Sequence, residues 1–219
     1  MILGIDTSLG TTVAVVESDG VVRSQLESAD PRGHAEVIGS LISRALAEAS
    51  ITPDAITHVA AGMGPGPFTG LRVGIAAARA FALGRGIPVI PVVSHDAVAL
   101  ERMLHDALTG GFDDAADGPL AVVTDARRRE FAYTVYQGID DDGLPVRVAE
   151  PALSLRDDLD ALLAARGIER VDAERIPAAM LALAAARALA AGREIATEEA
   201  LYLRSPDVTL SSGPKRVTQ

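Results

Sequence analysis

The sequence predicts an α/β protein built from two similar halves, each a mixed sheet flanked by helices. Two observations carry this prediction. In the first half, strand-like and helix-like segments follow the order βββ-α-β-α-β. After Pro119 a second strand–turn–strand unit begins, with Asp125 echoing Asp6, which suggests an internal duplication. A chain of 219 residues can bury two such cores. We expect the halves to span residues 1–102 and 103–219, with the C-terminal segment packing back on the first half.

The first half opens on strands. The apolar run ILGIDTS (2–8) ends in Asp, Thr and Ser, and TTVAVVES (11–18) is a second strand-forming run. Leu9 and Gly10 between them predict a tight hairpin. The segment SDGVVRSQLE (18–27) supplies an Asp-Gly turn and a third strand. Three strands therefore precede the first helix.

Helices and single strands then alternate. Residues 34–50 carry apolar side chains at helical spacing, and ITHVAAG (56–62) is typical of a short buried strand. The loop GMGPGPFTG (62–70) leads into a second helix, for which Thr69 is the predicted N-cap. The run IPVIPVVS (87–94) predicts another strand. This order places helices over a mixed sheet.

The second half repeats part of this pattern after a helix and a loop. Its expected elements are a helix over 95–108, a polar glycine-rich loop over 109–118, strands over 120–127 and 130–138, a hairpin turn over 139–144, a further segment over 146–154 and alanine-rich helical segments from 155 to 192.

Composition excludes several function classes. The net charge of −10 disfavours nucleic-acid binding by this chain alone, and the absence of cysteine excludes disulfides, thiolate metal sites and a cysteine nucleophile. The N-terminus lacks the features of a secretory signal, and the apolar segment 177–192 is too short to span a bilayer. We expect a cytoplasmic protein.

Two segments could hold a nucleotide. A carboxylate at a strand end can bind Mg²⁺, and amides before a helix N-terminus can bind phosphate. The candidate residues are Asp6, Thr7, Ser8, Gly64, Gly66, Thr69 and Gly70. The alternatives are an Asx-turn at Asp6 and a purely structural glycine turn. The loop matches neither a Walker motif nor G-x-G-x-x-G.

The helix after this loop has an unusual surface. Gly70, Gly74, Ala78 and Ala82 recur every fourth residue and form a ridge with almost no side chain. Such a ridge packs either on the chain's own sheet or on a helix of a partner protein, and the sequence favours neither.

The four histidines do not form a metal motif. His34, His58, His95 and His105 lack a two-ligand spacing with a nearby carboxylate, so we expect surface or capping roles. The basic cluster Arg127–Arg129 is expected to be solvated surface, and a role for it in guiding tRNA stays open.

Six segments, in order from residue 2 to about residue 207, resemble the TsaB family, also called YeaZ. They are ILGIDTS, HAEVIGSLI, GMGPGPFTGLRVGIAAARAFA, IPVIPVVSHDAVA, TDARRREFAYTVY and YLRSPD. The first also resembles the phosphate segment of the actin, hexokinase and heat-shock-chaperone ATPase superfamily. The GPG-x-FTGLR-x-G pattern with its alanine-rich helix is specific to TsaB and its catalytic relative TsaD.

The resemblance implies two duplicated actin-like, ribonuclease-H-like subdomains and a non-catalytic role. It implies that the chain binds TsaD, which transfers a threonylcarbamoyl group to adenosine 37 of ANN-decoding tRNAs, with the ATPase TsaE completing the complex. It also implies a possible homodimer when TsaD is absent and tRNA contact mainly through the partners. No cofactor is implied for this chain, whereas ATP and Mg²⁺ are possible in the assembled complex.

Departures from TsaD favour the non-catalytic member. TsaD carries a metal-binding H-x-x-x-H, but here Ala99 stands four residues after His95. Residues 150–219 also lack the Gly-Gly adenosine loop of TsaD and the kinases. The alternative functions are an ATP-dependent phosphotransferase or ATPase of the same superfamily and, less favoured, a metallopeptidase.

In the family, the helices after the HA motif and after GPG-x-FTG contact TsaD or a second TsaB. These helices correspond to residues 34–49 and 69–84 here. The expected interface residues are His34, Val37, Ile38, Leu41, Gly70, Leu71, Gly74, Ile75, Ala78 and Ala82.

Overall fold

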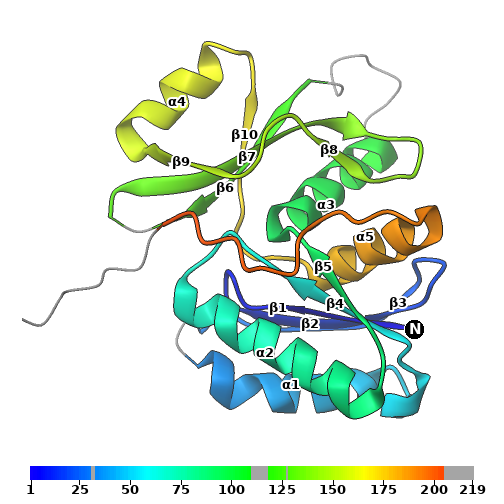
Figure 1. Cartoon of the computed structure of the whole chain (residues 1–219). Coiled ribbons are helices and arrows are strands. Elements are labelled where there is room, and N and C mark those ends of the chain that lie inside the picture. The colour runs from blue at the N-terminus through cyan, green and yellow to red at the C-terminus, as the bar shows by residue number, and fades with distance from the viewer. Residues whose placement is uncertain (31–32, 110–117, 127, 205–219) are drawn as a thin grey trace, which may run out of the picture.

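A computed structural model describes residues 1–30, 33–109, 118–126 and 128–204. It contains two mixed sheets of five strands each, with helices on their outer faces and between them (Figure 1). This architecture confirms the predicted α/β fold class. Parts of the predicted 109–118 loop, together with Arg127 and the end of the YLRSPD segment, lie outside the described residues.

The first sheet has the strand order β3-β2-β1-β4-β5. Its strands are β1 (Ile2–Asp6), β2 (Thr11–Val16), β3 (Val22–Ser28), β4 (His58–Gly62) and β5 (Val89–Val92). The first three strands pair antiparallel, whereas β4 and β5 continue the sheet parallel to β1. On one face pack α1 (His34–Glu48) and α2 (Phe68–Arg85), and a short 3-10 helix, η1 (Pro53–Ala55), precedes β4.

The second sheet repeats this arrangement. Its elements are β6 (Leu120–Asp125), β7 (Glu130–Ile139), β8 (Pro145–Arg147), β9 (Ala152–Leu155) and β10 (Glu169–Asp172), with α4 (Arg156–Ala164) on its outer face. Strands β6, β7 and β8 pair antiparallel, and β10 is parallel to β6 as β4 is parallel to β1. Asp125 therefore ends β6 as Asp6 ends β1.

Two helices separate the sheets. The helix α5 (Ala178–Ala191) contacts the first sheet, and α3 (Ser94–Thr109) contacts α5 and the second sheet (Figure 1). The close approach of α5 to β1 requires a glycine at position 4, because a Cβ atom at Gly4 would lie 2.4 Å from the Ala178 carbonyl oxygen. The expected boundary at residues 102 and 103 falls inside α3, and α5 from the C-terminal half lies on the first sheet.

Two local expectations were wrong. The N-cap of α2 is Pro67, with no side-chain capping hydrogen bond, so Thr69 already lies inside the helix. The segment 155–192 is not helical throughout, because Gly167 in the left-handed region follows α4 and β10 then pairs with β6. That parallel pairing joins residues about fifty positions apart, and the alanine-rich composition of the surrounding segment does not reveal it. In the described part of the chain, no helix is long and apolar enough to cross a membrane.

Candidate functional site

A cleft of about 290 Å³ lies where the two halves meet. One wall is the glycine/proline loop at the start of α2, and the other comes from the ends of β6 and β7. The residues that line it are Pro65, Gly66, Pro67, Phe68, Thr69, Thr124, Asp125, Ala126, Arg128, Ala132, Leu153, Tyr202, Leu203 and Arg204. The volume is at the lower end of the range for small-molecule sites.

Asp6 does not line this cleft, although it was a candidate Mg²⁺ ligand. One of its carboxylate oxygens accepts from the Ser8 amide at 2.7 Å and the Ser8 hydroxyl at 2.5 Å. The other accepts from the Ser94 hydroxyl at 2.5 Å. Burial raises the pKa of the Asp6 carboxyl, against the opposing effect of these hydrogen bonds. The geometry is that of an Asx-turn, and it does not fit direct ligation of Mg²⁺ by Asp6.

The glycine loop packs tightly on the turn that follows Asp6. A Cβ atom at Gly62 would lie 1.8 Å from the Asp6 carboxylate, and one at Gly66 would lie 2.6 Å from the Ser8 side chain. Ser94, at the start of α3, accepts from the Gly64 amide at 3.0 Å and so joins the loop to Asp6. The loop glycines are therefore required by close internal packing.

The candidate nucleotide residues separate into two groups. Gly66 and Thr69 line the cleft. The other five are buried behind it: Asp6, Thr7, Ser8, Gly64 and Gly70. In the described chain, no three His, Cys, Asp or Glu side chains gather in a metal-binding arrangement.

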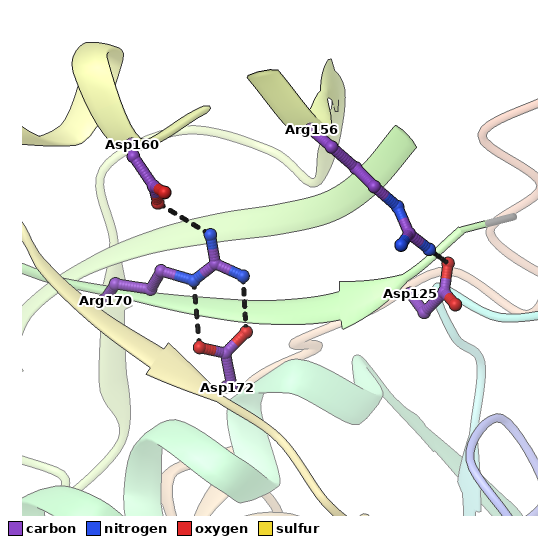
Figure 2. A network of polar contacts seen from close by, with 5 residues as sticks. All are labelled: Asp125, Arg156, Asp160, Arg170 and Asp172. Atoms are coloured by element: carbon purple, nitrogen blue, oxygen red, sulfur yellow. Dashed lines mark hydrogen bonds and ion pairs between the residues drawn. The ribbon is translucent and has the colours of Figure 1, made fainter. Parts of the chain in front are cut away.

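Asp125, the counterpart of Asp6, is exposed and belongs to a polar network (Figure 2). The Arg156 guanidinium donates to its carboxylate at 2.6 Å. Close by, Arg170 donates to Asp160 at 2.7 Å and binds Asp172 through two hydrogen bonds of 2.9 and 2.6 Å. An arginine therefore balances the one carboxylate that the described chain places on the cleft wall.

The Phe131 ring contacts both arginines of this network. The Arg170 guanidinium lies 4.4 Å from the centre of its ring, and that of Arg156 lies 5.0 Å from it. Both distances are those of cation–π contacts. Sequence patterns do not reveal this arrangement, because its members come from β6, β7, α4 and β10.

His95, near the start of α3, is buried against the second sheet, so the expected surface or capping role was wrong. Its two ring nitrogens lie 2.8 Å from the Thr134 hydroxyl and 3.0 Å from the Thr124 hydroxyl. Burial lowers the pKa of His95 to about 3. His34 is also buried, with Nδ1 2.8 Å from the Thr11 hydroxyl. Both imidazoles have their partners inside the chain.

Asp96 is the neighbouring buried acid. Its carboxylate accepts from the Tyr136 hydroxyl at 2.8 Å, and the Arg147 guanidinium lies 3.4 Å away. Burial raises the pKa of Asp96 to about 7, with Arg147 and the tyrosine hydrogen bond opposing it. The side chain also lines a second cavity of about 310 Å³. Nothing in the sequence pattern singled out this cluster.

The small-residue ridge of α2 is internal, so it forms no exposed surface. Gly74 packs on Thr7, while Ala78 and Ala82 belong to the core between the helices and the first sheet. Of the ten expected interface residues, only Val37 is half-buried; the other nine are buried within the chain. The four-residue spacing of small residues is the same whether the ridge packs inside the chain or on a partner protein, so the sequence could not distinguish the two.

The outward faces of α1 and α2 carry other small residues, which the expectation missed. Gly39 on α1 and Gly84 on α2 are exposed, and a Cβ atom at either position would meet no atom of the described residues within 4 Å. Ala76 and Ala80 are exposed on α2, and Leu83 near its end is 85% exposed. The exposed sides of these helices therefore carry small and apolar residues, interspersed on α2 with the exposed Arg72 and Arg79.

Comparison with known proteins relates the chain to tRNA modification. A family model described as TsaD, tRNA N6-adenosine threonylcarbamoyltransferase, matches residues 22–152. An uncharacterized protein of Mycobacterium tuberculosis (strain ATCC 25618 / H37Rv) is 35% identical over 94% of this chain and 92% of its own. A tRNA N6-adenosine threonylcarbamoyltransferase of Streptococcus pneumoniae (strain ATCC 700669 / Spain 23F-1) is 44% identical over 42% of this chain. The match covers only 32% of that enzyme.

Solved structures show the same fold. YeaZ from Pseudomonas aeruginosa superimposes with a TM-score of 0.71 at 22% identity, over 92% of this chain and 99% of that one. A Pseudomonas aeruginosa protein described as similar to peptidase YEAZ gives a TM-score of 0.73 at 23% identity, over 93% and 99%. The chain therefore has the fold of YeaZ, with its two actin-like halves.

Proposed function

Since the chain belongs to the TsaD family of tRNA-modification proteins, we propose that it is the accessory member of that family, TsaB. In this role it binds a TsaD-type transferase and is required for threonylcarbamoyl transfer to adenosine 37 of ANN-decoding tRNAs. It supplies no catalytic group, and TsaE joins as a third subunit. A second copy of the chain occupies the same surface when TsaD is absent.

The enclosure of Asp6 is the observation that carries the non-catalytic role. An actin-like ATPase needs the carboxylate that ends its first strand to reach Mg²⁺ and phosphate. Here three hydrogen bonds from Ser8 and Ser94 occupy that carboxylate, and it lies outside the cleft. His95 is held between two threonines, so neither group is free to act on a substrate.

The exposed face of α1 and α2 supports partner binding. Glycine inside an exposed helix costs about 1 kcal/mol relative to alanine. Gly39 carries this cost although no neighbouring atom among the described residues requires a glycine there. Small side chains at Gly39, Ala76 and Ala80 would allow a partner helix to approach closely, and the exposed Leu83 would add apolar contact.

Size-exclusion chromatography of this chain with a TsaD-type subunit tests the proposal. The variant Ala76→Trp places a large side chain on the exposed face of α2 and is expected to abolish the complex. The matched control is Ala161→Trp, because Ala161 is equally an exposed helix alanine but lies on α4. Both variants are expected to melt like the parent chain. A complex that survives Ala76→Trp would show that this face is not the interface.

A phosphotransferase or ATPase of the same superfamily is the second candidate function. The cleft between the halves favours it, because Thr69, Thr124 and Arg128 could contact an anionic ligand there. Titration calorimetry of the isolated chain with MgATP discriminates between the two functions. Stoichiometric tight binding with turnover would support the enzyme, whereas no heat of binding supports the accessory role.

A further inference from the structure

The C-terminal part of the described chain is an irregular segment whose last three residues reach the cleft. After α5 ends, residues 196–204 cross between α2 and the second half without forming a helix or a strand (Figure 1). We call these residues the strap. Three of them, Tyr202, Leu203 and Arg204, form part of the cleft wall.

The strap is fixed to α2 at two levels. The Arg79 guanidinium donates to the Glu198 carbonyl oxygen at 2.6 Å. One end of the strap stacks on the start of the helix, where the rings of Tyr202 and Phe68 lie 4.3 Å apart. Arg72 donates to the Tyr202 hydroxyl at 3.2 Å, and its guanidinium lies 5.7 Å from the centres of both rings.

The strap contacts both halves of the chain. On the first half, the Leu201 amide donates to the Met63 carbonyl oxygen at 2.7 Å. Three residues later, Arg204 forms an ion pair with Glu130 of β7. Residues 201–204 of the strap therefore contact the elements on both sides of the cleft.

We propose that the strap is a latch that closes the cleft, and that release of Tyr202 from Phe68 and Arg72 opens it. Irregular segments held by side-chain contacts open locally at lower free energy than sheets and core helices. Tyr202 is 38% exposed, so its ring can leave without exposing a large core surface. Opening detaches the wall formed by Tyr202, Leu203 and Arg204 from the glycine loop.

Partner binding on α2 would release this latch, an extension that rests on the proposed function. Arg72, Ala76 and Arg79 lie at positions i, i+4 and i+7, on one side of the helix. A helix docked over Ala76 therefore meets the two arginines that hold the strap. Docking and latching compete for the same guanidinium groups, so the partner-bound chain has the open cleft.

Cysteine labelling tests the latch cleanly, because the chain contains no cysteine. Ala132 is buried and lines the cleft, so Ala132→Cys reports access to it. Adding Tyr202→Ala is expected to raise the rate at which a maleimide reacts with this cysteine about three- to tenfold. This is the change in the equilibrium between closed and open cleft that loss of one aromatic pair produces. Tyr202→Phe retains stacking and is expected to give a smaller increase. Ala161→Cys, on exposed α4, serves as the control and keeps its rate.

An unchanged rate in the Ala132→Cys, Tyr202→Ala chain would overturn the latch. If that chain fails to melt cooperatively, Arg204→Ala replaces Tyr202→Ala and is expected to raise the rate in the same way. A TsaD-type subunit is then added to the Ala132→Cys chain, with complex formation followed by size exclusion. Binding with faster labelling supports the competition, and binding with no change refutes it. Absence of binding refutes the proposed function and the competition, while the latch result from the chain alone stands.

Discussion

The Gly74 amide donates a hydrogen bond of 3.0 Å to the Thr7 hydroxyl, and a Cβ atom at Gly74 would lie 2.2 Å from that oxygen. The same hydroxyl donates to the Gly70 carbonyl oxygen at 2.7 Å. The first turns of α2 are therefore bound directly to the turn that follows β1. The glycines that suggested a partner surface fix the helix to its own sheet.

Replacing Gly74 should destabilise the fold rather than a complex. We expect Gly74→Val to lower the free energy of unfolding by about 2–4 kcal/mol, from overpacking and loss of the hydrogen bond to Thr7. Urea unfolding measures this change. Ala76→Val, at an exposed position two residues away, should cost less than about 1 kcal/mol. Equal effects of the two variants would contradict the internal role of the ridge.

His95 should make the fold sensitive to acid. Its pKa is about 3 in the folded chain, against an ordinary value of 6.5. Between these values the unfolded chain binds more protons, so the free energy of unfolding falls as the pH drops, by up to about 1.4 kcal/mol per pH unit. Melting between pH 7 and 4.5 measures this slope. Asp96 contributes with the opposite sign in the same pH range, so the test is the difference between the two chains. His95→Gln should change the slope by up to about 1.4 kcal/mol per pH unit toward greater stability at low pH, and a slope equal to the parent's would contradict this role of His95.

Asp96 should act in the opposite direction. Its pKa is about 7 when folded and 3.8 ordinarily, so the folded chain binds more protons between these values. The free energy of unfolding therefore decreases as the pH rises through this interval, and the loss is complete above pH 7. Asp96→Asn keeps an acceptor for the Tyr136 hydroxyl and removes the buried charge. We expect the variant to melt higher than the parent at pH 8, and a lower melting temperature would show that the pairing with Arg147 dominates.

Glycine on the outer face of α1 allows a test that separates stability from binding. Gly39→Ala should raise the free energy of unfolding by about 1 kcal/mol, because alanine is the better helix former and the site is open. The same variant should bind the TsaD-type subunit more weakly, because its added methyl group occupies space that the glycine leaves for a partner helix. Gly39→Trp should retain stability and lose binding. Thermal melts and size exclusion of both variants check these outcomes.

Much of the fold could be predicted because local patterns and tertiary contacts agree. The apolar runs of β1, β2 and β4 are buried strands and that of β5 is a half-buried strand. The helical spacing of α1 and α2 matches the faces that these helices bury. The strand β10 was missed because its pairing with β6 is a long-range contact, without which Glu169–Asp172 has little strand character.

The site was harder to predict than the fold. The segment YLRSPD was part of the family resemblance, but its position gave no sign that Tyr202 stacks on Phe68. In the same way, Asp125 is paired by an arginine 31 positions along the chain. Contacts of this kind depend on how the two halves meet, which periodicity does not encode.

The accessory role is tested most directly by reconstituting tRNA modification. A TsaD-type transferase with TsaE, threonylcarbamoyl adenylate, ATP and Mg²⁺ is incubated with an ANN-decoding tRNA, with and without this chain, and the modified adenosine is quantified. We expect modification only when the chain is present, and restoration by an Asp6→Asn variant that still folds and binds. Equal modification without the chain would contradict the account.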